Sequence, residues 1–206
     1  MSRNKDLFKD YTFYWHEGVS HKNIPLADIR NLVNQVSVSK DHIVYSYFFH
    51  EEKCILGDNR CDCFGYKDKI FDVTDLIGLV HSDDLDEIYR LTKNAFDIIY
   101  NNQVNIYSFK YNITYRVKYK RNQYRRILRE TTPILADKNG KLICTLSRCT
   151  DISQLGHHNE IKAWLTFPDK AIDLSLELNN ILSKREKEIL YYLSKGYSSR
   201  KISVEL

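Results

Sequence analysis

The side chains best suited to chemistry in this 206-residue chain are its cysteines and histidines, and one group lies close together. His50 is followed by three of the five cysteines, Cys54, Cys61 and Cys63. Zinc binds these residue types, but neither a C-x6-C nor a C-x-C spacing is one of its usual pairs. The N-terminus has no apolar stretch of the kind found in a signal peptide, which argues against a disulfide framework. We therefore expect structural thiols and no bound metal.

Other patterns that would indicate catalysis are missing from the sequence. His157 and His158 are adjacent, and adjacent histidines rarely point at one ion, so we interpret them as part of a solvated link. The sequence contains no G-x-S-x-G, P-loop or H-E-x-x-H pattern. We expect a protein that is not an enzyme and that carries no cofactor.

Positive charge is concentrated at the C-terminal end. Residues 182–206 hold six bases against three acids, a net charge of +3 in 25 residues, whereas the whole chain carries only +4. Such a local excess is typical of a small unit that meets a polyanion.

The element that must organise the rest is residues 106–119. Apolar and aromatic residues alternate there with polar ones, and the first set is Tyr107, Phe109, Tyr111, Ile113, Tyr115, Val117 and Tyr119. This period of two predicts a long strand with one buried face, with Lys110, Arg116 and Lys118 facing solvent.

Two further strands should pair with this one to form an antiparallel meander. A polar turn at 120–123 precedes a strand at 124–136, and the turn signal at 137–140 precedes a strand at 141–147. Pro133 cannot donate to a ladder, so we expect a bulge or a frayed end there.

The first half of the chain predicts helices and two strands. Leu26, Ile29, Leu32, Val33 and Val36 recur at helical spacing after Pro25. Strands are predicted at 43–49 and 53–56. A long helix should open at 81–84, capped by Ser82 or Asp83, and end at Asn101-Asn102. Its expected buried stripe consists of Leu85, Ile88, Leu91, Ala95 and Ile98.

The predicted fold class is therefore α+β, a five-stranded antiparallel sheet with helices on one face. Residues 40–152 resemble a PAS domain. The resemblance is carried by the segments 56–59 (LGDN), 64–66 (FGY), 79–84 (LVHSDD), 115–117 (YRV), 137–142 (DKNGKL) and 149–152 (CTDI). It implies a sensory or dimerising module with strand order 2-1-5-4-3 and a homodimer, and its pocket would take an unknown small molecule. Flavin and haem remain alternatives: Gly57 to Asp62 echo a flavin motif only faintly, and His81 is a frequent helix-entry residue.

Residues 182–206 resemble the opening of a LuxR-type helix-turn-helix. The matching positions are Leu182, Arg185, Glu186, Glu188, Ile189, Leu190, Leu193, Gly196, Ser198, Ile202 and Leu206. Ser183 and Glu186 form a capping-box pattern. The family's recognition helix would follow Leu206 and is not in the sequence, so we expect a regulator truncated before that helix. The remaining segment would bind DNA through phosphate contacts of Ser198, Ser199, Arg200 and Lys201.

These observations divide the chain into an N-terminal helical segment (1–40), a PAS-like sensor (41–152), a connector (153–181) and a partial LuxR-type DNA-binding domain (182–206). The function they favour is a signal-responsive DNA-binding transcriptional regulator. The alternative is a stand-alone PAS module that binds a ligand or a protein and does not bind DNA. We expect a cytoplasmic protein with no membrane partner.

Overall fold

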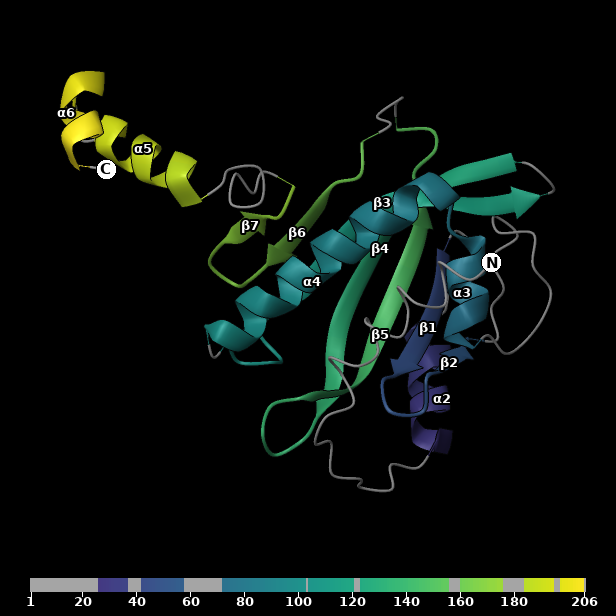
Figure 1. Ribbon diagram of the computed structural model, residues 1–206. Coiled ribbons are helices and arrows are strands. Elements are labelled where there is room, and N and C mark those ends of the chain that lie inside the picture. The colour runs from purple at the N-terminus through teal and green to yellow at the C-terminus, as the bar shows by residue number, and fades with distance from the viewer. Residues whose placement is uncertain are drawn as a thin grey trace. The chain divides into compact units, whose positions relative to one another are not determined.

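The computed structural model describes the chain as two compact units, Met1–Leu174 and Ser175–Leu206. The first unit contains a sheet with helices, and the second contains two helices (Figure 1). The residues that the structure describes are 26–36, 42–57, 72–102, 104–120, 123–155, 160–175, 184–194 and 197–205.

The first unit is built on one antiparallel sheet in the order β2-β1-β5-β4-β3-β6-β7. The order of the first five strands is the 2-1-5-4-3 that the PAS resemblance implies. The strands are β1 His42–Phe48, β2 Lys53–Leu56, β3 Lys110–Lys120, β4 Gln123–Ala136, β5 Leu142–Asp151, β6 Ala163–Thr166 and β7 Ala171–Asp173.

The sheet has seven strands and not the five that were predicted, because residues expected to form a connector contain β6 and β7. β6 pairs with β3 from Lys110↔Thr166 to Ile113↔Ala163. Ala163 and Leu165 are fully buried, so this strand completes the core. The strand is only four residues long, which is too short to distinguish a strand from a packed loop by pattern alone.

One face of the sheet is covered by α4 (Leu85–Asn101), which lies across the strands in Figure 1. Leu91, Ala95 and Ile99 of this helix are buried against Ile113 and Tyr115 of β3. Leu85, Ile88 and Ile98 of the predicted stripe are only partly buried, and the stripe also includes Thr92 and Ile99. The helix ends at Asn101, as predicted.

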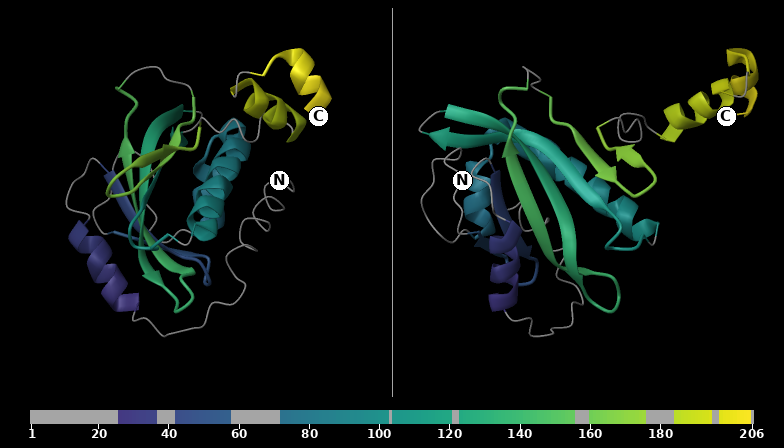
Figure 2. Two further views of the ribbon diagram at one scale, coloured as in Figure 1. Left: turned by 90° about the vertical axis from the view of Figure 1, so that its left-hand side faces the viewer. Right: turned by 180° about the vertical axis from the view of Figure 1, so that it is seen from behind.

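The other face is covered in part by α2 (Leu26–Val36), which corrects the expectation of helices on one face only. Ile29 and Val33 pack with Val44, Phe48 and Cys144 in a second, smaller core. Neighbouring residues of a strand point to opposite faces, so Val44 reaches α2 while Tyr45 reaches the α4 side. Figure 2 shows the sheet edge-on, with α2 and α4 on its two sides. Between β2 and α4 lies α3 (Val73–Leu79), whose first turn is closed by a capping box of Asp72 and Asp75.

The inner face of β3 is buried as predicted from Phe109 onward, but burial does not alternate, because Asn112 and Thr114 on the other face are buried too. Phe109, Tyr111, Ile113, Tyr115 and Val117 are buried. Tyr107 is an exception: it lies in a turn before the strand and is 56% exposed. The side chains on the opposite face are less exposed to solvent than predicted, because Lys110, Arg116 and Lys118 are half-buried.

The turns of the meander follow their sequence signals. Gly140 has a φ of 78°, a left-handed conformation that a glycine adopts without steric cost. The register of β4 against β5 shifts between Pro133 and Leu135, which confirms the irregularity expected at the proline.

The second unit contains α5 (Lys184–Ser194) and α6 (Ser199–Glu205). Ile202 of α6 is buried, and the ring of Tyr197 stacks on that of Tyr192 at 5.4 Å between centroids. Leu182, Gly196 and Leu206, on which part of the LuxR resemblance rests, lie outside the described residues, as does Ser183 of the predicted capping box.

A membrane-spanning helix would need a long apolar stretch. Among the residues that the structure describes, no helix has the length and apolar character for this.

Candidate functional site

A row of hydroxyl-bearing side chains crosses four strands on the face of the sheet that α4 covers. The register places Tyr45 of β1 opposite Ser147 of β5, Ser147 opposite Thr131 of β4, and Thr131 opposite Tyr111 of β3. We call these four residues the hydroxyl row. Directly paired residues share a face, so all four side chains point to the same side of the sheet.

The hydroxyl row is deeply placed and hydrogen-bonded. Tyr45, Ser147 and Tyr111 are buried and Thr131 is half-buried. The hydroxyls of Thr131 and Ser147 lie 3.0 Å apart, and Tyr111 contacts Thr92 of α4 at the same distance. Burying a hydroxyl group costs free energy unless it has a hydrogen-bond partner. An apolar core would not need such a network at this position.

A positive charge lies beside the hydroxyl row. Arg129 of β4 pairs in register with Cys149 of β5 and Ile113 of β3. These residues lie two positions along their strands from the hydroxyl row, and therefore on the same face of the sheet. The guanidinium carbon of Arg129 is 5.4 Å from the ring centroid of Tyr115 and 5.9 Å from that of Tyr111. A half-buried guanidinium that lies near two aromatic rings is suited to bind an acidic or carbonyl oxygen.

The ionisable groups near Arg129, the hydroxyl of Tyr45 and the thiol of Cys149, are neutral because burial raises their pKa values. Burial raises the pKa of Tyr45 well above its ordinary value, and the nearby Arg129 opposes this only in part. Burial also raises the pKa of Cys149 to about 12, again against the effect of Arg129. Arg129 is thus accompanied here by neutral hydroxyl and thiol groups.

The cysteines behave as structural thiols where the structure describes them. Cys54, Cys144 and Cys149 are free and buried. Burial raises the pKa of Cys54 and raises that of Cys144 to about 12. Cys61 and Cys63, which complete the candidate metal group with His50, lie outside the described residues, as do His157 and His158. Within the described part of the chain, no three His, Cys, Asp or Glu residues gather closely enough to hold a metal ion.

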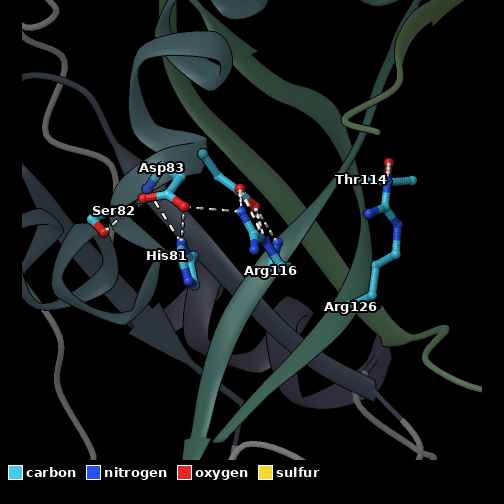
Figure 3. Close-up of polar contacts among 7 residues, drawn as sticks. His81, Ser82, Asp83, Thr114, Arg116 and Arg126 are labelled. Carbon is cyan, nitrogen blue, oxygen red and sulfur yellow. Dashed lines mark hydrogen bonds and ion pairs between the residues drawn. The ribbon is translucent and has the colours of Figure 1, made fainter. Parts of the chain in front are cut away.

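The entry to α4 uses its polar residues differently from the prediction. Neither Ser82 nor Asp83 caps the long helix: Asp84 occupies the N-cap position and makes no capping hydrogen bond. Its carboxylate accepts hydrogen bonds from the backbone N–H of Arg116 at 2.8 Å and from the guanidinium Nε at 3.0 Å. Figure 3 shows Arg116 turned toward the segment that carries His81, Ser82 and Asp83.

The four residues predicted to touch DNA phosphates lie at the start of α6. Ser198 precedes the helix, and its hydroxyl accepts a hydrogen bond from the backbone N–H of Lys201 at 3.4 Å. Ser198, Ser199 and Lys201 are exposed, and the ammonium of Lys201 lies 4.0 Å from the ring centroid of Tyr197. The side chain of Arg200 lies outside the description.

Sequence reasoning missed the hydroxyl row and the Asp84–Arg116 pair. The residues of these two features come from four strands and the segment before α4, and only the register of the strands brings them together. The period of two placed Tyr111 on the inner face, but the partner strands also had to be aligned to single residues.

No protein-family model matches the chain, and no curated protein matches it. Among solved structures, it is similar to a sensory box histidine kinase/response regulator from Burkholderia thailandensis. The identity is 15%, the match covers 59% of this chain and 85% of the other, and the TM-score is 0.44. It is also similar to the N-terminal domain of a diguanylate cyclase with a PAS/PAC sensor from Marinobacter aquaeolei. Here the identity is 17%, the match covers 57% of this chain and 99% of the other, and the TM-score is 0.43.

Proposed function

We propose that this protein is a signal-responsive regulator of transcription, in which the first unit binds a small molecule and the second binds DNA. The observation that carries the sensory part is the buried hydroxyl row with Arg129 beside it. Its chemistry favours a small ligand with an acidic group, for which Arg129 supplies the charge and the hydroxyls supply hydrogen bonds.

The DNA-binding part is supported by charge and by side-chain chemistry. The second unit presents Ser198, Ser199 and Lys201 on its surface and carries a local excess of bases. Such contacts hold phosphates and carry no base information. The binding should therefore be weak, independent of DNA sequence and strongly weakened by salt.

The sensory part is tested by ligand-induced stabilisation. The full chain is heated with a panel of small mono- and dicarboxylic acids and with their uncharged amide analogues. At least one acid should raise the melting temperature of the wild type, because a ligand that binds only the folded state stabilises it by mass action.

The matched variants are Arg129→Gln and Arg125→Gln. Both remove one guanidinium from the inner face of β4, but Arg125 is held by Asp151 at the strand end, 2.7 Å away. The stabilising acid should lose its effect on Arg129→Gln and keep it on Arg125→Gln. If no acid outperforms its amide on the wild type, the ligand proposal is wrong.

The DNA-binding part is tested by fluorescence anisotropy with labelled duplexes at low salt. The double variant Arg200→Gln/Lys201→Gln should bind roughly tenfold more weakly, since it removes two phosphate contacts. Wild-type affinity should be equal for unrelated duplexes. A chain that binds the acid but shows no DNA binding at any salt concentration would instead be a stand-alone ligand-binding module.

A further inference from the structure

A second concentration of positive charge lies far from the C-terminal unit in the sequence, at the end of the β3–β4 hairpin. Residues 116–126 contain six bases, Arg116, Lys118, Lys120, Arg121, Arg125 and Arg126, and no acid. Two tyrosines, Tyr119 and Tyr124, lie among them. We call residues 116–120 and 123–126 the basic ribbon.

The outer pairs of the basic ribbon extend beyond the segments that flank it, whereas its inner end is flanked: Val117 forms a bridge with Val80, and the carbonyl of Arg126 accepts a hydrogen bond from Ile152. β6 pairs with β3 only as far as Ile113, and the last register pair of β5 with β4 is Ile127↔Asp151. Further out, Lys118 pairs with Tyr124 and Lys120 with Gln123. Figure 1 shows these paired ends of β3 and β4 reaching past the rest of the sheet, and the view from behind in Figure 2 agrees.

One face of the basic ribbon gathers like charges. Arg116 lies directly opposite Arg126, and the next pair on that face is Lys118 with Tyr124. Like charges in direct cross-strand register destabilise a sheet. Figure 3 shows the two arginines extending from neighbouring strands, and Arg126 there donates a hydrogen bond to Thr114 at 3.0 Å.

Only part of this charge is neutralised within the molecule. Arg116 is paired with Asp84, and Arg125 lies 2.7 Å from Asp151. Lys118 and Arg126 form no ion pair with any residue that the structure describes. Tyr124 is 43% exposed beside them. The charges of Asp84 and Glu160 act on Arg126 without forming an ion pair with it, so the cross-strand alignment of bases leaves a local excess of positive charge that favours an anionic partner.

The shape of the basic ribbon favours one kind of polyanion. The major groove of B-DNA is wide enough to admit a two-stranded β-ribbon, and phosphates line both of its edges. Bases on a protruding ribbon can reach those phosphates while Tyr124 packs on the adjacent sugar. We propose that the basic ribbon binds the backbone of duplex DNA, as a second contact that does not depend on α6.

The test is DNA binding by the full chain with charge-matched variants. Lys118→Gln/Arg126→Gln removes two bases from the basic ribbon. Lys138→Gln/Lys141→Gln removes two from the turn at the opposite end of β4 and serves as the control. Arg200→Gln/Lys201→Gln reports on the second unit. Affinity for a labelled duplex is measured by anisotropy over a range of salt concentrations.

The basic-ribbon variant should bind at least roughly tenfold more weakly at low salt, and the slope of log K against log salt should fall by about 2, since each phosphate contact contributes about 0.9. The control should match the wild type. Arg126→Lys keeps the charge and should retain most of the affinity, which separates charge from a folding defect.

Equal affinity of the basic-ribbon variant and the control would overturn the inference, and so would a wild type that binds no duplex at low salt. Vesicles containing phosphatidylserine provide the competing anionic surface, and tighter binding to them than to the duplex would also reject a DNA contact. If α6 does not bind DNA, the Arg200→Gln/Lys201→Gln variant will match the wild type, as the control does, while the basic-ribbon variant will still bind more weakly, so the two proposals fail separately.

Discussion

Asp84 shows how a single side chain joins a helix to a strand. Its carboxylate is 4% exposed and binds both the backbone and the guanidinium of Arg116. The hydrogen bond to Asp84 is the largest cause that raises the pKa of Arg116. Asp84 therefore fixes the start of α4 against β3, in place of the capping role predicted for its neighbours.

Replacing Asp84 with Asn should lower the free energy of unfolding by about 2–3 kcal/mol, because the guanidinium loses its charged partner while Arg116 stays partly within reach of water. Asp83→Asn is the matched control: its side chain is 72% exposed and 3.9 Å from Arg116, so the change should be under about 0.5 kcal/mol. Urea unfolding followed by circular dichroism measures both. Equal effects of the two variants would show that the carboxylate of Asp84 has no special role.

The buried thiols should be unreactive in the folded protein. The thiolate is the reactive form, and burial raises the pKa values of Cys54, Cys144 and Cys149. In a Cys61→Ser/Cys63→Ser variant at pH 8, Ellman's reagent should modify these three thiols at least about a hundredfold more slowly than in guanidinium chloride. A thiol that reacts at once in the native protein would contradict the structural interpretation.

At the scale of elements, β6 protects the edge of the strand on which the unit is built. It satisfies backbone groups of β3 and inserts Ala163 and Leu165 into the core. Asn112 of β3 also reaches across, donating to the carbonyl of Trp164 at 3.3 Å and to the hydroxyl of Thr166 at 3.0 Å. The first unit therefore depends on residues that follow the predicted sensor domain.

Leu165→Ala should destabilise the first unit by about 3 kcal/mol, since it leaves a cavity at a fully buried position. Asp169→Ala, on the exposed turn between β6 and β7, should change stability by under about 0.5 kcal/mol. Both are measured by urea unfolding. A small effect of Leu165→Ala would mean that β6 contributes little to the core.

At the scale of the whole molecule, we predict a homodimer. The PAS resemblance implies it, and the sequence between Phe8 and Trp15 carries an aromatic cluster that would otherwise expose an apolar patch. That cluster lies outside the described residues. Sedimentation velocity at micromolar concentration should show a dimer that dissociates on dilution. A single monomeric species across that range would contradict the prediction.

The sequence by itself determined the strands of the meander, the long helix and the order of the first five strands in the sheet. Period-two alternation in β3, the Asp137–Gly140 turn and the break at Pro133 are local signals, and local geometry decides them. The segment resemblance to PAS domains then supplied the strand order.

Tertiary structure decided which faces the helices cover, where β6 joins and which polar residues meet. The inner position of Tyr45 beside Ser147 depends on the register between β1 and β5, which lie far apart in the chain. A shift by one residue would send these side chains to the opposite face, and no local pattern specifies that alignment. The same holds for Asp84, since its partner Arg116 lies 32 residues away. Long-range pairing therefore builds the candidate site from residues whose sequence neighbourhoods do not mark them.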